Sequence, residues 1–141
     1  MYDLSGLRSG QVQRVIADWK ALRDRMSPGR DQAYLHHRGK PLVAVWGVGF
    51  GDRRAYSLSE CASLVEFLKE DGCSVMLGVP SGWRNLDRDA APDPELHELL
   101  RSIDVLSPWN VGRYNSSRVL AGHVETIWKP DTRWCSKHGV D

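Results

Sequence analysis

Residues 41–46 read PLVAVW, a short run that is apolar at every position. A strand with one face in water alternates apolar and polar residues, whereas a strand covered on both faces is apolar throughout, as in parallel sheets with helical crossovers. Two more largely apolar runs follow, CSVMLGVP at 73–80 and VLSPW at 105–109. We therefore predict three internal strands of a parallel sheet, with a strand ending in residues 1–6 and another opening at 140–141.

Stretches with helical spacing separate these runs, because their apolar residues recur every three or four positions. The sequence predicts helices over residues 11–26, 57–70, 93–103 and 116–127, and another turn or two over 132–138. Ser57 with Glu60 forms a capping-box pattern at one helix start. Pro130 is expected to break or kink the last helix. Residues 34–40 are interpreted as a polar linker that turns at Gly39.

Strands and helices that alternate in this way indicate an α/β protein with parallel strands and right-handed crossovers. Two architectures fit the pattern. One is a doubly wound open sheet, and the other is part of an eight-stranded βα barrel, with about four consecutive βα units. Periodicity alone does not separate them.

Composition and charge exclude several classes of protein. The 141 residues carry 19 basic and 18 acidic side chains, a net charge of +1, so nothing favours nucleic acid or an anionic membrane surface. No apolar run reaches the roughly 20 residues of a membrane span. Three cysteines at wide spacing indicate neither a disulfide framework nor a zinc site. We expect no cofactor and no metal. Residues 1–20 contain no signal-peptide core, and the sequence does not indicate the cellular compartment of the protein.

Ligands of both architectures bind at the loops that follow the strands. Trp46, Trp83 and Trp109 each end a predicted strand or begin such a loop. An indole ring offers a rigid apolar face and one N–H donor, which suits the C–H face of a sugar ring. The alternative is that the three rings only plug the mouth of the sheet.

Two charged residues lie at the same predicted edge. Asp3 ends the first strand and is a candidate ligand contact, or else the acceptor of a local turn to Ser5 or Gly6. Arg113 either binds a hydroxyl or carboxylate of a ligand, or pairs with Asp3 and joins two loops. Asp104 precedes a strand, so we assign it to the face that serves stability.

Other motifs are interpreted structurally. The glycines of WGVGFG at 46–51 lack the spacing of a dinucleotide-binding loop, so we interpret them as permitting tight turns and close packing. A third hypothesis, a small nucleotide-binding enzyme, would require the loop at 47–51 to hold a phosphate group. His36 and His37 are adjacent and are assigned to a solvated linker. His97 and His123 are assigned to surface or interface roles on helices away from the loops that follow the strands.

Four segments together resemble one family. They are MYDLSG at 1–6, GKPLVAVWG at 39–47, MLGVP at 76–80 and SPWNVGRY at 107–114. The chain is similar over nearly its whole length to bacterial glycoside hydrolase family 71/99-like proteins, some of which carry xylosidase or arabinosidase names. The best-understood relatives are endo-α-mannosidases.

The resemblance implies a single partial barrel domain over residues 1–141, lacking N-terminal and C-terminal strands of the roughly 250-residue fold. It implies an oligosaccharide or glycoside ligand, contacted by Asp3 and flanked by the three tryptophans, with Arg113 a further candidate. The catalytic carboxylates of the relatives lie on later strands, so no catalytic residue is carried over. Such relatives are often exported.

From these patterns we expect a fragment of a glycoside hydrolase barrel that is inactive alone. The alternative is a non-catalytic carbohydrate-binding α/β module. Apolar parallel strands also leave unpaired edges, which predicts self-association through those edges.

Overall fold

The apolar runs form the centre of a five-stranded sheet, in which the four parallel strands follow chain order, β1-β3-β4-β5. The computed structural model describes residues 1–141. The strands are β1 (Tyr2–Asp3), β2 (His36–His37), β3 (Lys40–Trp46), β4 (Ser74–Val79) and β5 (Val105–Pro108). The helices are α1 (Val12–Met26), α2 (Leu58–Glu70), α3 (Glu95–Leu100), α4 (Ser117–His123), the π-helix η1 (Val124–Trp128) and α5 (Lys129–His138).

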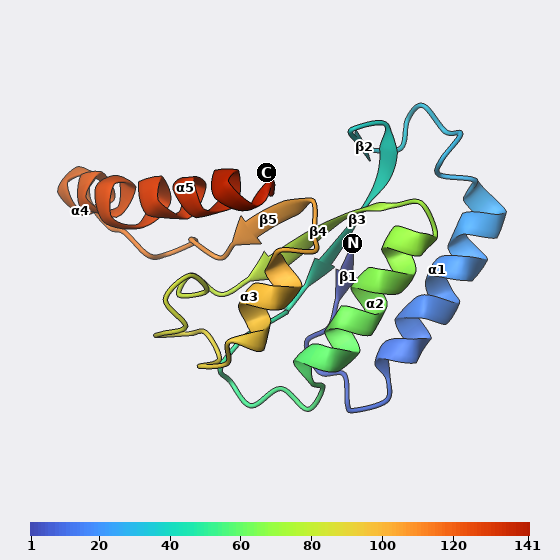
Figure 1. Cartoon of the computed structure of the whole chain (residues 1–141), viewed down its shortest axis with the longest axis horizontal. Coiled ribbons are helices and arrows are strands. Elements are labelled where there is room, and N and C mark those ends of the chain that lie inside the picture. The colour runs from blue at the N-terminus through green and yellow to red at the C-terminus, as the bar shows by residue number, and fades with distance from the viewer.

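Helices cover one face of the sheet. In Figure 1, α2 and α3 lie in front of the parallel strands, and α1 lies beside α2 at the right. Val45 on β3 pairs with Leu77 on β4, and both are buried beneath this layer. Leu64 and Leu68 on α2 are equally buried and belong to the same core. The observed fold is thus the mixed α/β arrangement with parallel strands that the sequence predicts.

The other face of the sheet carries no helix layer. Side chains alternate across a strand, so the neighbours of the buried residues point to this second face. Most of the side chains on it are only half-buried: Leu42, Ala44, Trp46, Met76 and Val105. We call this side the uncovered face.

Local signals set the ends of α2. The Ser57 hydroxyl accepts the Glu60 N–H at 3.2 Å, and the Glu60 carboxylate accepts the Ser57 N–H at 2.8 Å. The predicted capping box is therefore confirmed.

A second predicted structural residue, Asp104, lies at the amino end of β4. It accepts the Val75 N–H at 2.9 Å, and both its oxygens contact the Lys69 ammonium at 2.9 Å. Asp104 therefore serves stability, as predicted.

The linker prediction for residues 34–40 is wrong in part. His36 and His37 form β2, which pairs antiparallel with β3 through a tight turn at Arg38-Gly39. Both turn residues have positive φ, 48° and 77°, the geometry of two-residue hairpins. His37 is half-buried, with Nε2 2.8 Å from an oxygen of Asp141. The prediction failed because His36 and His37 form a strand only by pairing with β3, and their own sequence carries no strand pattern.

Pro130 does not break the last helix, so that part of the prediction is wrong. The chain continues from α4 through the π-helix η1 into α5, with Pro130 in the first turn of α5. The Lys129 N–H donates to the Val124 carbonyl, five residues back. The wider π turn accommodates the proline, which lacks an N–H. The helix then ends at Gly139, whose φ is 72°.

Asp141 lies beside β5. Its N–H donates to the Asp104 carbonyl at 2.9 Å, and its own carbonyl accepts the Leu106 N–H at 2.8 Å. These two bonds follow the pattern of a parallel ladder. The predicted strand opening at 140–141 therefore continues the same strand order.

Candidate functional site

The carboxyl ends of the parallel strands bring four residues into one row. Asp3 pairs with Trp46, Trp46 with Gly78, and Gly78 with Ser107. Residues paired across parallel strands point to the same side of the sheet. Since Val45 and Leu77 lie under the helices, this row belongs to the uncovered face. Two of the residues predicted from the sequence, Asp3 and Trp46, are therefore neighbours.

Trp46 lies flat across its neighbouring strand. A Cβ atom on Gly78 would come within 1.8 Å of Trp46 Cε3, so only glycine leaves room for the indole ring there. The ring of Trp109 meets Trp46 edge-on, with centroids 5.0 Å apart, and Phe50 lies 5.6 Å from Trp46 on another side. We call Trp46, Phe50 and Trp109 the aromatic platform.

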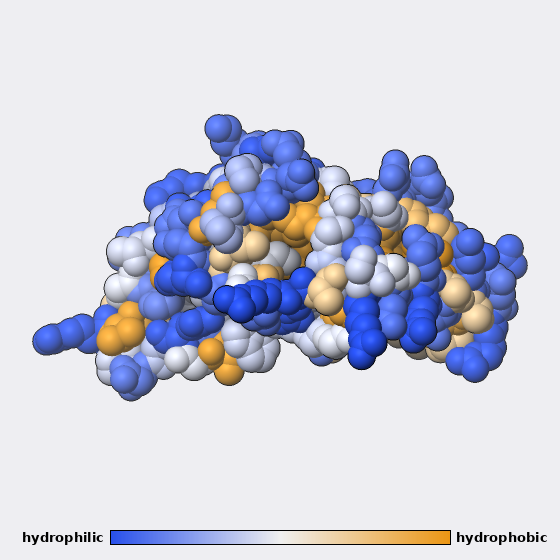
Figure 2. Space-filling view, turned by 90° about the horizontal axis from the view of Figure 1, so that it is seen from below, coloured by the Kyte–Doolittle hydropathy of each residue, from blue (hydrophilic) through white to orange (hydrophobic).

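The platform is open to solvent in part. Trp109 is 43% exposed, whereas Trp46 and Phe50 are half-buried. Figure 2 looks at the molecule from below, and hydrophobic side chains gather there in hollows between hydrophilic ones. Exposed aromatic rings held in fixed orientations are what apolar ligand faces bind.

Asp3 supplies a charged acceptor beside the platform. Its Oδ1 accepts the Ser5 N–H at 2.8 Å, which is the local turn considered in the sequence analysis. This backbone hydrogen bond lowers the pKa of the Asp3 carboxyl, so the exposed side chain is ionised at neutral pH. Arg54 holds the same loop, because Nη1 donates to the Ser5 hydroxyl at 2.7 Å.

Trp83 lies apart from the platform. It is fully buried, and its ring meets Trp134 edge-on at 4.9 Å and His97 at 6.5 Å. The Trp83 carbonyl lies 3.0 Å from His97 Nε2. The ring therefore packs between the loop after β4 and helices α3 and α5, and it presents no face to solvent.

Arg113 pairs with Asp89 and not with Asp3. Asp89 also accepts the N–H groups of Ser81 at 3.1 Å and Gly82 at 2.9 Å. Burial acts to raise the pKa of Asp89, but these hydrogen bonds and Arg113 outweigh it and the pKa is lowered. Asp89 therefore joins the loop after β4 to the loop after β5.

The glycine loop after β3 serves packing. Gly49 has φ of 79°, and a Cβ there would come within 2.6 Å of Leu96. A Cβ on Gly51 would come within 2.9 Å of the Ala90 carbonyl. The Gly51 N–H donates to the Asp89 carbonyl at 2.9 Å. These close approaches confirm the interpretation of the glycines as packing residues.

A polar pocket of about 280 Å³ adjoins the loop after β4. Its lining residues are Ser81, Gly82, Arg84, Asn85, Asp87, Arg88, Thr126, Ile127 and Asp131. Asp131 was not predicted as a site residue, because no local motif marks it. It reaches the loop only through the fold of α4, η1 and α5.

Asp131 is a buried acid, 8% exposed, whose Oδ1 accepts Arg84 Nε at 2.7 Å. Burial raises the pKa of the Asp131 carboxyl, and Arg84 offsets only part of that rise. A buried carboxylate whose charge is paired with one arginine holds that arginine in a fixed direction. Asp131 therefore positions Arg84 at the pocket.

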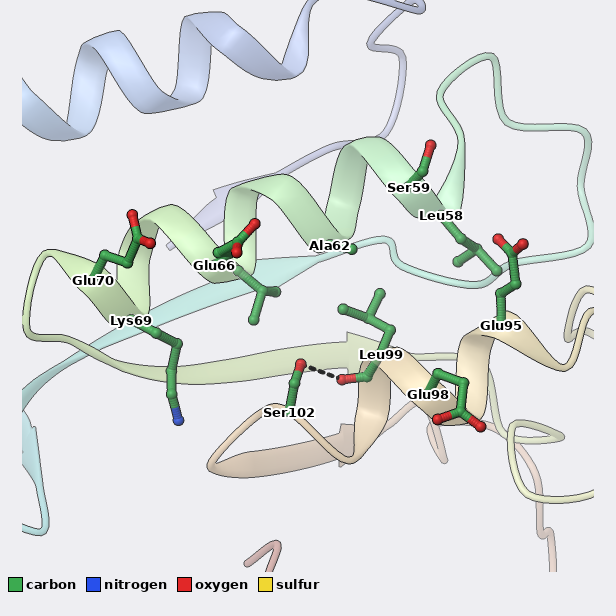
Figure 3. A pocket seen from close by; sticks show the side chains of 11 residues that line it. Leu58, Ser59, Ala62, Glu66, Lys69, Glu70, Glu95, Glu98, Leu99 and Ser102 are labelled. Atoms are coloured by element: carbon green, nitrogen blue, oxygen red, sulfur yellow. Dashed lines mark hydrogen bonds between the residues drawn. The ribbon is translucent and has the colours of Figure 1, made fainter.

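A larger cavity, about 610 Å³, is a groove between α2 and α3. Figure 3 shows Leu58 and Leu99 pointing into it, with Glu66, Glu95 and Glu98 around them. All of its residues belong to α2, to α3 or to the turn after α3. The groove is therefore separate from the loops that follow the strands.

No group of three or more histidine, cysteine or acidic side chains is arranged to hold a metal ion. None of the helices has the length and apolar character needed to cross a membrane. No protein family, curated protein or solved structure matches the chain.

Proposed function

We propose that the chain is the sugar-binding part of a glycoside hydrolase-type βα barrel, with the aromatic platform and Asp3 as its ligand contacts. The strand order supports the barrel over the doubly wound sheet. A doubly wound sheet reverses its order at a switch point, whereas the four parallel strands here follow chain order and Asp141 continues it.

The observation that carries the sugar ligand is the row of Asp3, Trp46 and Ser107 on the uncovered face, extended by Trp109. A sugar ring has an apolar C–H face and a rim of hydroxyls. The indole rings suit the face, and an ionised carboxylate with a serine hydroxyl suits the rim. Both are fixed at strand ends, where ligands of parallel sheets bind.

Binding without hydrolysis is the expectation for these residues alone. Glycoside hydrolysis ordinarily uses two carboxyl groups about 5–10 Å apart, one of them protonated. The hydrogen bond from the Ser5 N–H lowers the pKa of Asp3. The pKa of Asp89 is also lowered, although burial acts to raise it. Neither is a general acid at neutral pH. Hydrolysis would depend on carboxylates from other strands of a barrel. Because these two carboxyl groups are both ionised, they fit a non-catalytic carbohydrate-binding module as well as part of a hydrolase.

Calorimetric titration with xylo-, arabino- and manno-oligosaccharides tests the proposal. We expect the wild-type chain to bind one of these series and Trp109→Ala to weaken that binding at least tenfold. Met26→Ala is the control, since Met26 is also exposed but ends α1. An affinity that is the same in wild type and Trp109→Ala, or no binding to any series, would refute the proposal.

An aryl-glycoside assay accompanies the titration. We expect no turnover by the 141-residue chain. Turnover at ordinary enzyme rates would show that a catalytic pair lies among its own carboxylates.

A further inference from the structure

We propose that the polar pocket binds a single neutral sugar ring, separately from the aromatic platform, with Arg84, Asn85 and Thr126 as its contacts. This inference rests on the proposed function, because it names a second place where a glycoside is held. A volume of about 280 Å³ is slightly below the roughly 300–1,000 Å³ of ligand pockets, which indicates one ring and not a chain of rings.

The charges of the pocket favour a neutral ligand over an anion. Its two arginines are balanced by two aspartates, since Arg84 Nε donates to Asp131 at 2.7 Å and Arg88 Nε to Asp87 at 3.3 Å. An anion would have to compete with these carboxylates for the guanidinium groups. A sugar hydroxyl carries no charge, so it meets no such opposition.

The unused hydrogen-bonding capacity includes both donors and acceptors. The Asn85 carbonyl oxygen accepts Arg84 Nη1 at 2.9 Å, which leaves the Asn85 amide group to donate. The Thr126 hydroxyl donates to the Gly122 carbonyl at 2.8 Å, which leaves its lone pairs to accept. A ligand hydroxyl both donates and accepts, so it matches this mixture.

The π-helix η1 gives the pocket its shape. Thr126 and Ile127 lie within η1 and form the wall that faces the loop after β4. π turns inside helices occur frequently at functional sites. From the same helical side, Asp131 in α5 pairs with Arg84 on the opposite wall, the loop after β4, and holds it in place. Both walls of the pocket are thus held before a ligand enters.

The test is a titration of the whole chain, followed by NMR or calorimetry, with methyl glycosides of mannose, xylose and arabinose and, separately, with inorganic phosphate. We expect the wild-type chain to bind at least one methyl glycoside and not phosphate. The double variant Asn85→Ala/Thr126→Val should weaken that binding at least tenfold. Thr132→Val is the matched control, because its hydroxyl donates to the Trp128 carbonyl in the same way but lies outside the pocket.

Trp109→Ala separates the two proposals. It should weaken oligosaccharide binding and leave methyl glycoside binding unchanged. If methyl glycoside binding falls in Trp109→Ala and not in Asn85→Ala/Thr126→Val, the pocket proposal is overturned and the platform stands. Phosphate binding that depends on Asn85 and Thr126, or no methyl glycoside binding, would also overturn it. Oligosaccharide binding that is insensitive to Trp109 would refute the proposed function instead.

Discussion

The substitution Gly78→Ala tests the packing on which the site depends. A Cβ atom at this position would lie 1.8 Å from Trp46 Cε3 and 2.6 Å from Cζ3. Carbon atoms in contact are ordinarily about 3.5–4.0 Å apart, so the indole ring would have to shift by about 2 Å. Overpacking of this kind costs about 1–3 kcal/mol. Replacing glycine in a strand returns about 0.5–1 kcal/mol.

We therefore expect Gly78→Ala to lower the free energy of unfolding by about 1 kcal/mol, because a mid-range overpacking cost of about 2 kcal/mol is reduced by a glycine term of about 0.5–1 kcal/mol. With an m-value of about 2 kcal/mol/M, the urea midpoint should fall by about 0.5 M. The assay is equilibrium urea unfolding followed by circular dichroism. Sugar binding at the aromatic platform should weaken as well, since Trp46 leaves its position.

A double-mutant cycle with Trp46→Ala makes the test specific. Once the ring is gone, Gly78→Ala should stabilise the chain by about 0.5–1 kcal/mol, because only the glycine term remains. Gly122→Ala is the control, as nothing lies within 4 Å of a Cβ there and the residue is inside α4. The reasoning is refuted if Gly78→Ala has the same effect with and without Trp46.

Three substitutions elsewhere in the chain test other contacts and surfaces of the fold. Asp104→Asn should cost about 1–3 kcal/mol at pH 7, because hydrogen bonds to a charged group are lost. Burial opposes the charge of Asp104, yet Lys69 and the Val75 N–H lower its pKa, so urea titrations should show the difference shrinking as pH falls below about 4. Ser57→Ala removes the capping box and should cost about 1 kcal/mol in the same assay. We expect the uncovered face to be a second surface for self-association besides the strand edges, so Met76→Lys, which places a charge on that face, should reduce association in sedimentation experiments. Equal association of variant and wild type would show that the face does not contribute.

Much of the fold was predictable because its signals are local. The apolar runs around Val43, Val75 and Leu106 mark strands wherever they lie, and the Ser57 capping box marks a helix start by its own hydrogen bonds. The hairpin at His36 and the π turn before Pro130 were missed or misjudged. Both depend on partners that the local pattern does not contain.

The candidate site divides in the same way. Asp3, Trp46 and Trp109 follow directly from strand ends, and a parallel sheet gathers its strand ends at one edge. Trp83 also follows a strand, as Trp109 does, but its ring is buried against Trp134, which lies 51 residues further along the chain. Asp131 reaches the polar pocket only because α5 folds back onto the loop after β4.

The sequence by itself determined the alternation of strands and helices, the helix caps and the edge of the sheet where a ligand would bind, since each depends on residues close together in the chain. Only the tertiary structure decided the order of the strands, the partner of Arg113 and which tryptophans stay exposed. Those features are set by side-chain packing between distant segments, where a ring such as Trp46 requires a glycine on the next strand.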